Sequence, residues 1–219
     1  MVNENKRVFN NYNDENLEKI SLKDEEEMDL FVILDRSGSM SGSELDTING
    51  FNSFIERQSV QGHQIFVTTI LFDNEYEVLY NRKPISEVKP LTENEYFVRG
   101  STALLDSIGK TVNTYKNKVN SAMCIITTDG YENASREYNR DQIKDLILNS
   151  GWEFVFIGAD IDSYREASHI GIRDSRIAMS KKSSKGFKDM YDACSNITDT
   201  YYVERNIADN SVDWKEELE

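Results

Sequence analysis

The sequence predicts an α/β fold with a doubly wound, mostly parallel sheet and helices on both of its faces. Two observations lead to this prediction. Five short, strongly apolar runs recur along the 219 residues, and most of them are separated by segments of helical period. Apolar runs without polar alternation are typical of strands buried on both faces, and strands that alternate with helices are typical of parallel sheets.

The apolar runs are the predicted strands. They occupy residues 28–35, 63–73, 121–129, 152–160 and 175–180. Residues 75–91 differ from them, because this segment alternates apolar and polar residues and holds both prolines, Pro84 and Pro90. Proline donates no hydrogen bond to a neighbouring strand, so we expect an antiparallel edge strand here.

Five helices are predicted between and after the strands, at residues 44–58, 102–119, 140–151, 160–172 and 185–202. The first has apolar residues three and four positions apart, which predicts one stripe packed on the sheet. The residues of that stripe are Leu45, Ile48, Phe51, Phe54 and Ile55. Gly151 suits the end of the third helix. The resulting arrangement is Rossmann-like.

Charge and composition divide the chain into one domain and two acidic ends. We expect a polar extension over residues 1–27, a single domain over 28–205 and an acidic tail over 206–219. The formal net charge is −14. Nucleic acid and anionic membrane surfaces are therefore disfavoured as partners, because they would be repelled over most of the surface.

The expected location is the cytoplasm. No apolar run is long enough to span a bilayer, and the first residues lack the apolar core of a secretion signal. The two cysteines agree with this expectation, since Cys124 lies in an apolar run and Cys194 in a predicted helix. We expect two reduced, buried thiols rather than a disulfide.

Oxygen-bearing side chains follow the ends of two predicted strands and precede one helix. Asp35 ends the first strand, Ser37 and Ser39 follow it at alternate positions, Asp129 ends a later strand, and Thr102 begins a helix. Loops at the carboxyl ends of parallel strands converge, so these side chains are expected on one rim. All are hard oxygen donors, which suit a hard divalent cation such as Mg²⁺.

Each of these residues also has an ordinary structural explanation. Ser37 or Ser39 would cap the helix that follows, and Thr102 would cap the next one. An aspartate at a strand end often accepts backbone N–H bonds. All five residues on one rim, in this order, favour the metal site.

The segments "DRSGSM", "GSTALLDSIG" and "TTDGYEN" resemble the metal-ion-dependent adhesion site of von Willebrand factor A (vWA) domains. The similarity covers roughly residues 28–200 and is greatest to small stand-alone vWA proteins of bacteria and phages. It implies that Ser37, Ser39 and Thr102 contact the metal, and that Asp35 and Asp129 bind it directly or through water. Mg²⁺ is the implied ion, with Mn²⁺ or Ca²⁺ as alternatives.

The resemblance implies a protein-binding module rather than an enzyme. A metal held mainly by neutral hydroxyls stays electron-poor and takes an aspartate or glutamate from a partner protein. An ATPase or a larger assembly is the kind of partner that some bacterial members recruit. We expect the partner-binding rim, or else ordinary exposed loop positions, at Arg36, Met40, Ser41, Arg99, Ser101, Tyr131, Glu132 and Asn133.

Catalytic interpretations have weaker support. The segment "GSMSG" places Met40 where the nucleophile of a serine hydrolase would stand. The two histidines, His63 and His169, have no evident partner for acid–base chemistry. A metal-dependent hydrolase that uses the same site stays open as the alternative function. A third alternative is a metal that only stabilises the rim.

Overall fold

The computed structural model describes residues 27–204, 214, 215 and 218. Nearly all of the predicted N-terminal extension and most of the predicted acidic tail therefore lie outside the described residues. Among the described positions of the tail, Trp214 is buried and its indole Nε1 donates to the Ser175 carbonyl at 3.0 Å. Trp214 thus packs on the domain.

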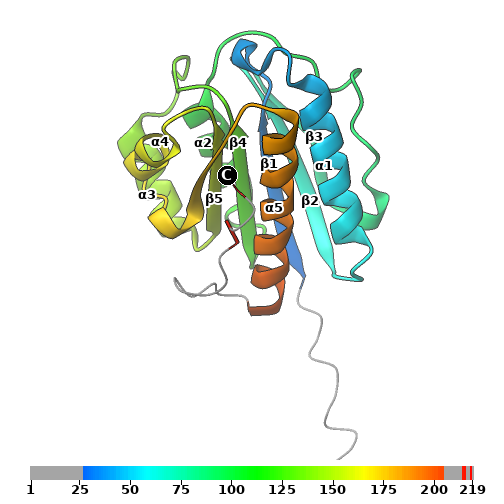
Figure 1. Ribbon diagram of the computed structural model, residues 1–219. Helices are drawn as coiled ribbons and strands as arrows, with labels where there is room; N and C mark the ends of the chain where they lie inside the picture. The colour runs from blue at the N-terminus through cyan, green and yellow to red at the C-terminus, as the bar shows by residue number, and fades with distance from the viewer. Residues whose placement is uncertain (1–26, 205–213, 216–217, 219) are drawn as a thin grey trace, which may run out of the picture.

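A six-stranded sheet forms the centre of the molecule (Figure 1). The strands are β1 (Met28–Asp35), β2 (Ile65–Phe72), β3 (Tyr76–Pro84), β4 (Ala122–Thr128), β5 (Glu153–Ala159) and β6 (Ile177–Ser180). Their order is β3-β2-β1-β4-β5-β6, and only the β2–β3 pair is antiparallel. The predicted antiparallel edge strand is confirmed, although it ends at Pro84 instead of running through both prolines.

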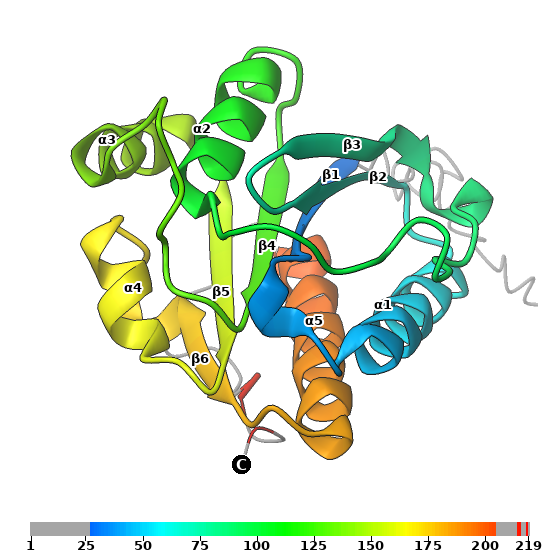
Figure 2. The ribbon, with the colours of Figure 1, turned by 90° about the horizontal axis from the view of Figure 1, so that it is seen from above.

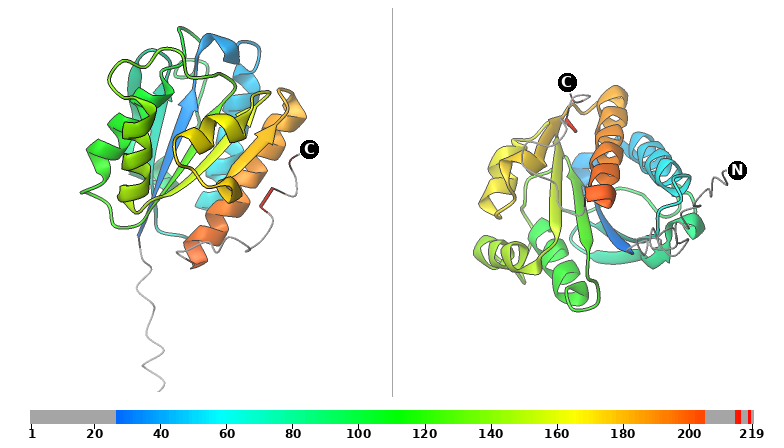
Figure 3. Two further views of the ribbon diagram at one scale, coloured as in Figure 1. Left: turned by 90° about the vertical axis from the view of Figure 1, so that its left-hand side faces the viewer. Right: turned by 90° about the horizontal axis from the view of Figure 1, so that it is seen from below.

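Helices cover both faces of the sheet, as predicted (Figures 2 and 3). The helices are α1 (Glu44–Ser59), α2 (Leu104–Tyr115), α3 (Arg140–Ser150), α4 (Ser163–His169) and α5 (Ser184–Glu204). Helices α1 and α5 lie side by side on one face, and α2, α3 and α4 lie on the other. Gly151 ends α3 in the left-handed conformation, with φ of 74°.

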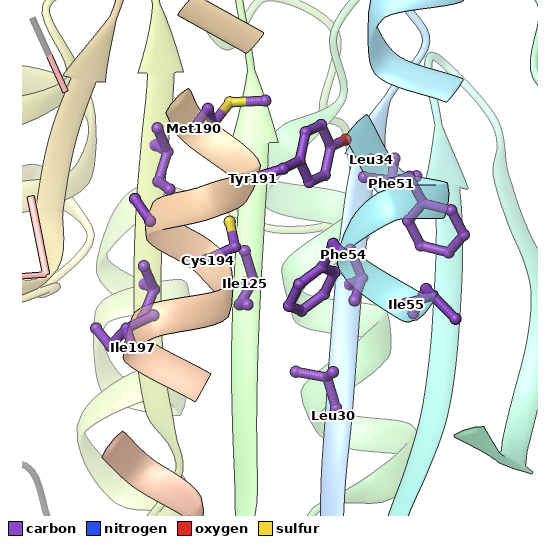
Figure 4. Close-up of a cluster of buried hydrophobic side chains, with 14 of the residues drawn as sticks. Leu30, Leu34, Phe51, Phe54, Ile55, Ile125, Met190, Tyr191, Cys194 and Ile197 are labelled. Atoms are coloured by element: carbon purple, nitrogen blue, oxygen red, sulfur yellow. The ribbon is translucent and has the colours of Figure 1, made fainter. Parts of the chain in front are cut away.

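The two faces of β1 belong to two separate cores. Leu30 and Leu34 face the core below α1 and α5 (Figure 4), whereas Phe31 and Ile33 face the core below α2 and α3. Phe31 stacks on Trp152 with ring centroids 4.4 Å apart. Because both faces of the central strand are buried, its sequence is apolar without polar alternation.

One residue of the predicted α1 stripe is misplaced. Leu45 is 59% exposed, while Thr47 and Gly50 are buried in its stead. At 100° per residue, Leu45 lies beyond the edge of the stripe that Phe51 and Phe54 centre on the sheet. Gly50 permits the approach of α5, because a β carbon there would lie 2.1 Å from the Tyr191 ring.

Two expectations about the rest of the chain can be compared with the structure. Cys124 and Cys194 are both free and buried, as predicted, and burial raises the pKa of each thiol. Among the described residues, no helix combines the length and the apolar character needed to cross a bilayer.

Strand order determines where the loops leave room for a site. Strand β1 lies between β2 and β4, and the chain leaves β1 towards α1 on one face but leaves β4 towards α3 on the other. Such a reversal opens a crevice at the carboxyl edge of a parallel sheet. The register pairs Leu34 with Thr127, so Asp35 and Thr128 stand level at this edge.

Candidate metal centre

The five predicted ligands gather at the carboxyl edge, where β1, β4 and the loop before α2 meet. The hydroxyl oxygens of Ser37 and Ser39 lie 3.0 Å apart, and the Thr102 hydroxyl donates to that of Ser37 at 3.0 Å. The surroundings of Gly130 show that these oxygens lie close together. A β carbon at Gly130 would lie 2.8 Å from Thr102 Oγ1, 2.9 Å from Ser39 Oγ and 3.5 Å from Asp35 Oδ2. Asp129 is the adjacent residue.

Asp35 is the most deeply buried of the five. Its side chain accepts hydrogen bonds from the Ser37 backbone N–H at 2.7 Å and from the Thr128 hydroxyl. Burial raises the pKa of this carboxyl to about 6, although the two hydrogen bonds act in the opposite direction. The carboxylate is therefore under-stabilised, and a nearby positive charge would favour it.

The hydroxyls do not serve as helix caps. Ser43 and Ala103 are the N-cap residues of α1 and α2, and the Ser37 hydroxyl makes no capping bond to the 3₁₀ turn Gly38–Met40. The ordinary structural explanation therefore fails for the hydroxyls of Ser37, Ser39 and Thr102. For Asp35 the ordinary explanation is correct in one respect, because its carboxylate accepts a hydrogen bond from the backbone N–H of Ser37.

Asp129 carries a buried carboxylate whose charge is met by a lysine. Its side chain is 1% exposed, and within the described part of the chain neither oxygen accepts a hydrogen bond. Lys182 Nζ lies 2.8 Å from Asp129 Oδ2 as an ion pair and donates to the Ser39 carbonyl. One ammonium group thus joins Asp129 to the serine turn.

Neighbouring residues hold Thr102 and the start of α2 in place. Asn133 accepts a hydrogen bond from the Thr102 N–H at 2.9 Å and donates its own N–H to the Thr102 carbonyl at 3.0 Å. The Glu132 carboxylate accepts the N–H of Leu105 at 2.9 Å, which satisfies one of the free donors at the start of α2. Both residues therefore position the site.

Six of the eight predicted rim residues have accessible surface, and two do not. Ser41, Arg99, Ser101, Tyr131 and Asn133 are exposed and Glu132 is half-buried. The prediction is wrong for Arg36, which is 0% exposed, and for Met40, which is 2% exposed. Arg36 turns inward because its guanidinium pairs with Asp73 at 3.0 Å and with Glu77 at 2.8 Å, and Met40 packs in the core below α1.

Three residues that support the site were not predicted. The Thr128 hydroxyl donates to the Asp35 carboxylate, Lys182 forms an ion pair with Asp129, and the Tyr96 hydroxyl donates to the Asp35 carbonyl at 2.6 Å. Lys182 follows β6, so the rule that gathers loops at the carboxyl ends of strands would have found it. No signal in the sequence marks Tyr96, which reaches the site from an irregular loop.

A polar hollow of about 540 Å³ opens beside Thr102. Two of the predicted rim residues, Ser101 and Asn133, line it. Lys110, which pairs with Glu137 at 2.7 Å, also lines it. The hollow is therefore a polar space next to the loop that carries Thr102.

The residues present fit a hard divalent cation. Three hydroxyls without capping partners converge with a buried carboxylate whose pKa is raised, that of Asp35, and with the second buried carboxylate, that of Asp129. Neutral and anionic oxygens are what Mg²⁺ prefers. Ser37, Ser39 and Thr102 would hold the ion, with Asp35 and Asp129 behind or beside them.

Gly130→Ala is expected to weaken Mg²⁺ binding about tenfold. Substitutions of residues that orient metal ligands typically reduce metal affinity by this amount or more. The added methyl group would lie under 3.0 Å from the hydroxyls of Ser39 and Thr102 and would force them apart. Calorimetric titration with Mg²⁺ measures the effect. Ser41→Ala, at an exposed rim position, is the control and should bind as wild type does. Unchanged affinity in Gly130→Ala would show that these oxygens are not the ligands.

No protein-family model and no curated protein matches the sequence. Several solved structures do match the fold. The vWF domain of the type V pili tip protein Mfa5 from Porphyromonas gingivalis is 11% identical, with a TM-score of 0.60 over 83% of this chain and 98% of that one. The pilus adhesin SpaC from Lactobacillus rhamnosus GG is 13% identical, with a TM-score of 0.63 over 78% of this chain and 30% of that one.

Proximal thread matrix protein 1 from the mussel byssus is 15% identical, with a TM-score of 0.57 over 78% of this chain. The chain spans 46% of the length of the mussel protein and 30% of the pilus adhesin, so it corresponds to one part of each. At these identities the likeness concerns the fold alone. Together with the six-stranded, mostly parallel sheet, it shows that this chain has a vWA-like fold.

Proposed function

We propose that the protein is a divalent-cation-dependent binding module that captures an acidic side chain of a partner protein. Ser37, Ser39 and Thr102 would hold the cation, and Asp35 and Asp129 would balance its charge. Mg²⁺ is the proposed ion, with Mn²⁺ or Ca²⁺ as substitutes. The partner would belong to a larger assembly or be an ATPase.

One observation carries the proposal. Three side-chain hydroxyls from two separate segments converge at the carboxyl edge of the sheet without capping any helix. Helix capping therefore does not explain why these hydroxyls converge, whereas ligation of a hard cation does. The adhesin and pilus-tip origin of two similar structures is consistent with a binding role.

The chemistry of the site favours binding of an anion. When bound, a divalent cation supplies an electron-poor centre that attracts a carboxylate. This chain supplies neutral hydroxyls, which leave more of the positive charge uncompensated than carboxylates would. Ser41, Ser101 and Tyr131 are exposed around the site and would contact the partner. With the cation bound, the site would attract an acidic side chain although the protein as a whole has a net charge of −14.

Within the described part of the chain, neither histidine offers the hydrolase alternative a base at the site. His63 precedes β2, at the edge of the sheet opposite the site, and its ring stacks on Tyr202 at 3.7 Å. His169 is the last residue of α4 and is exposed. Neither histidine lies where it would take a proton from a water molecule at the site. We therefore favour the binding function.

The test is affinity capture from an extract of the cells that produce the protein. A partner retained by wild type in Mg²⁺, but lost with a chelator and with Asp129→Ala, would support the proposal. Glu93→Ala is the control, because Glu93 is an equally acidic but exposed loop residue. Loss of capture when one acidic residue of the partner is replaced would identify the captured side chain.

The same experiment separates the other outcomes. Capture that is equal in all arms would contradict a metal-dependent interface. Product release from the captured protein, only with metal, would favour the hydrolase. A cytoplasmic location is kept as part of the proposal, and the location of the captured partner tests it.

A further inference from the structure

Lys182 lies inside the proposed metal centre, and its role there rests on the proposed function. It belongs to the short connection between β6 and α5, 53 residues after Asp129 in the chain. Its ammonium group lies 2.8 Å from Asp129 Oδ2 and also donates to the Ser39 carbonyl. These two contacts connect a proposed ligand and the backbone of the turn that carries two others.

The positive charge of the Lys182 ammonium group would repel a metal ion bound at the same centre. Asp129 has a side chain that is 1% exposed, and within the described residues Lys182 is the cation paired with it. A divalent cation at the same centre needs the same carboxylate, directly or through water. Two positive groups at one buried carboxylate repel each other strongly, because little solvent screens them.

We infer that Lys182 is a tethered competitor of the divalent cation. It neutralises Asp129 in the metal-free protein and must leave that carboxylate when the metal binds. Without Lys182, the metal-free centre would hold a buried carboxylate with no partner, which is strongly destabilising. The lysine therefore stabilises the metal-free state and reduces the affinity for the metal.

The adjacent Lys181 provides a matched comparison. It carries the same charge in the same connection, but it is exposed and lines a different hollow with Met179 and Leu218. Replacing it removes one positive charge from the molecule without removing a contact to Asp129. Any difference between the two variants therefore reports on the contact and not on net charge.

The experiment compares wild type, Lys182→Met and Lys181→Met by calorimetric titration with Mg²⁺ and by thermal unfolding. Methionine keeps the length of the side chain and removes its charge. We expect Lys182→Met to bind Mg²⁺ about tenfold more tightly than wild type, the least that measured couplings of close charge pairs imply. Lys181→Met should bind as wild type does.

Thermal unfolding distinguishes competition from a purely structural contact. Lys182→Met should melt below wild type in a chelator, and saturating Mg²⁺ should remove the difference. A lysine with only a structural role would lower the melting temperature equally in both conditions, and this result would overturn the inference.

Affinity also separates this inference from the proposed function. Equal Mg²⁺ affinity in wild type and Lys182→Met would overturn the competition but leave the metal centre standing. Absence of Mg²⁺ binding in all three proteins would overturn both.

Discussion

Asp35→Asn is expected to raise the melting temperature of the metal-free protein at neutral pH and to abolish its stabilisation by Mg²⁺. Burial raises the pKa of this carboxyl from 3.8 to about 6, so the charged form of Asp35 destabilises the folded state. That shift corresponds to roughly 2–3 kcal/mol at pH values above the folded pKa. Asparagine removes the charge and keeps an acceptor for the Ser37 N–H.

The sign of the pH dependence follows from the raised pKa. The folded protein binds this proton more tightly than the unfolded chain, so the stability that the proton contributes is complete below about pH 4. It is lost as the pH rises through about 6. The advantage of Asp35→Asn over wild type should therefore be largest above about pH 7 and should vanish below about pH 4.

Thermal unfolding in a chelator and in Mg²⁺, across this pH range, measures both effects. Mg²⁺ should stabilise wild type by mass action and should leave Asp35→Asn unchanged, because its affinity falls by more than about a hundredfold. Glu93→Gln, at an exposed loop position, controls for the loss of a negative charge. An Asn variant that melts below wild type in chelator at neutral pH would contradict the prediction.

Asp73→Ala is expected to lower the free energy of unfolding by about 3 kcal/mol. Asp73 is 0% exposed and accepts from Arg36 Nε at 3.0 Å and from Arg99 Nε at 2.7 Å. Among the described residues, its loss would leave the half-exposed Glu77 as the one anionic partner of the buried Arg36 guanidinium. Removing one partner of a buried ion pair is more damaging than removing both.

Urea denaturation measures this effect. Glu75→Ala is the matched control, because Glu75 pairs with the exposed side of Arg99 at 2.6 Å. Solvent screens that ion pair, so its removal should leave the stability nearly unchanged. Equal effects of the two substitutions would show that burial of Arg36 does not decide the outcome.

Most of the architecture was predictable because the strands are buried on both faces. The run "MDLFVILD" coincides with β1, and the segment with two prolines forms the antiparallel edge strand. The helix predicted from residue 102 begins at Leu104, and the hydroxyl of Thr102, which precedes the helix, donates to that of Ser37. Such small differences in helix bounds depend on contacts between segments, which local periodicity does not contain.

The side chains at the site divide in a similar way. Asp35, Ser37 and Ser39 were predictable as a group because they follow one strand within five residues. Arg36 was predicted as a rim residue, but its position depends on Asp73, which the β1–β2 pairing brings alongside. The position of Lys182 at the carboxyl edge was predictable because it follows β6, but its pairing with Asp129, which is distant in the chain, was not.

The hydrogen bond from Tyr96 to the Asp35 carbonyl divides the long connection between β3 and α2 into two parts. Tyr96 is 0% exposed and anchors the middle of that connection to the central strand. The part after it is short and carries Thr102. The part before it reaches solvent at Thr92, Glu93 and Asn94, and Thr92 and Glu95 hydrogen-bond each other there. Because Tyr96 fixes the connection between this turn and Thr102, a tag or reporter domain inserted at residues 92–94 should leave the geometry of the site unchanged.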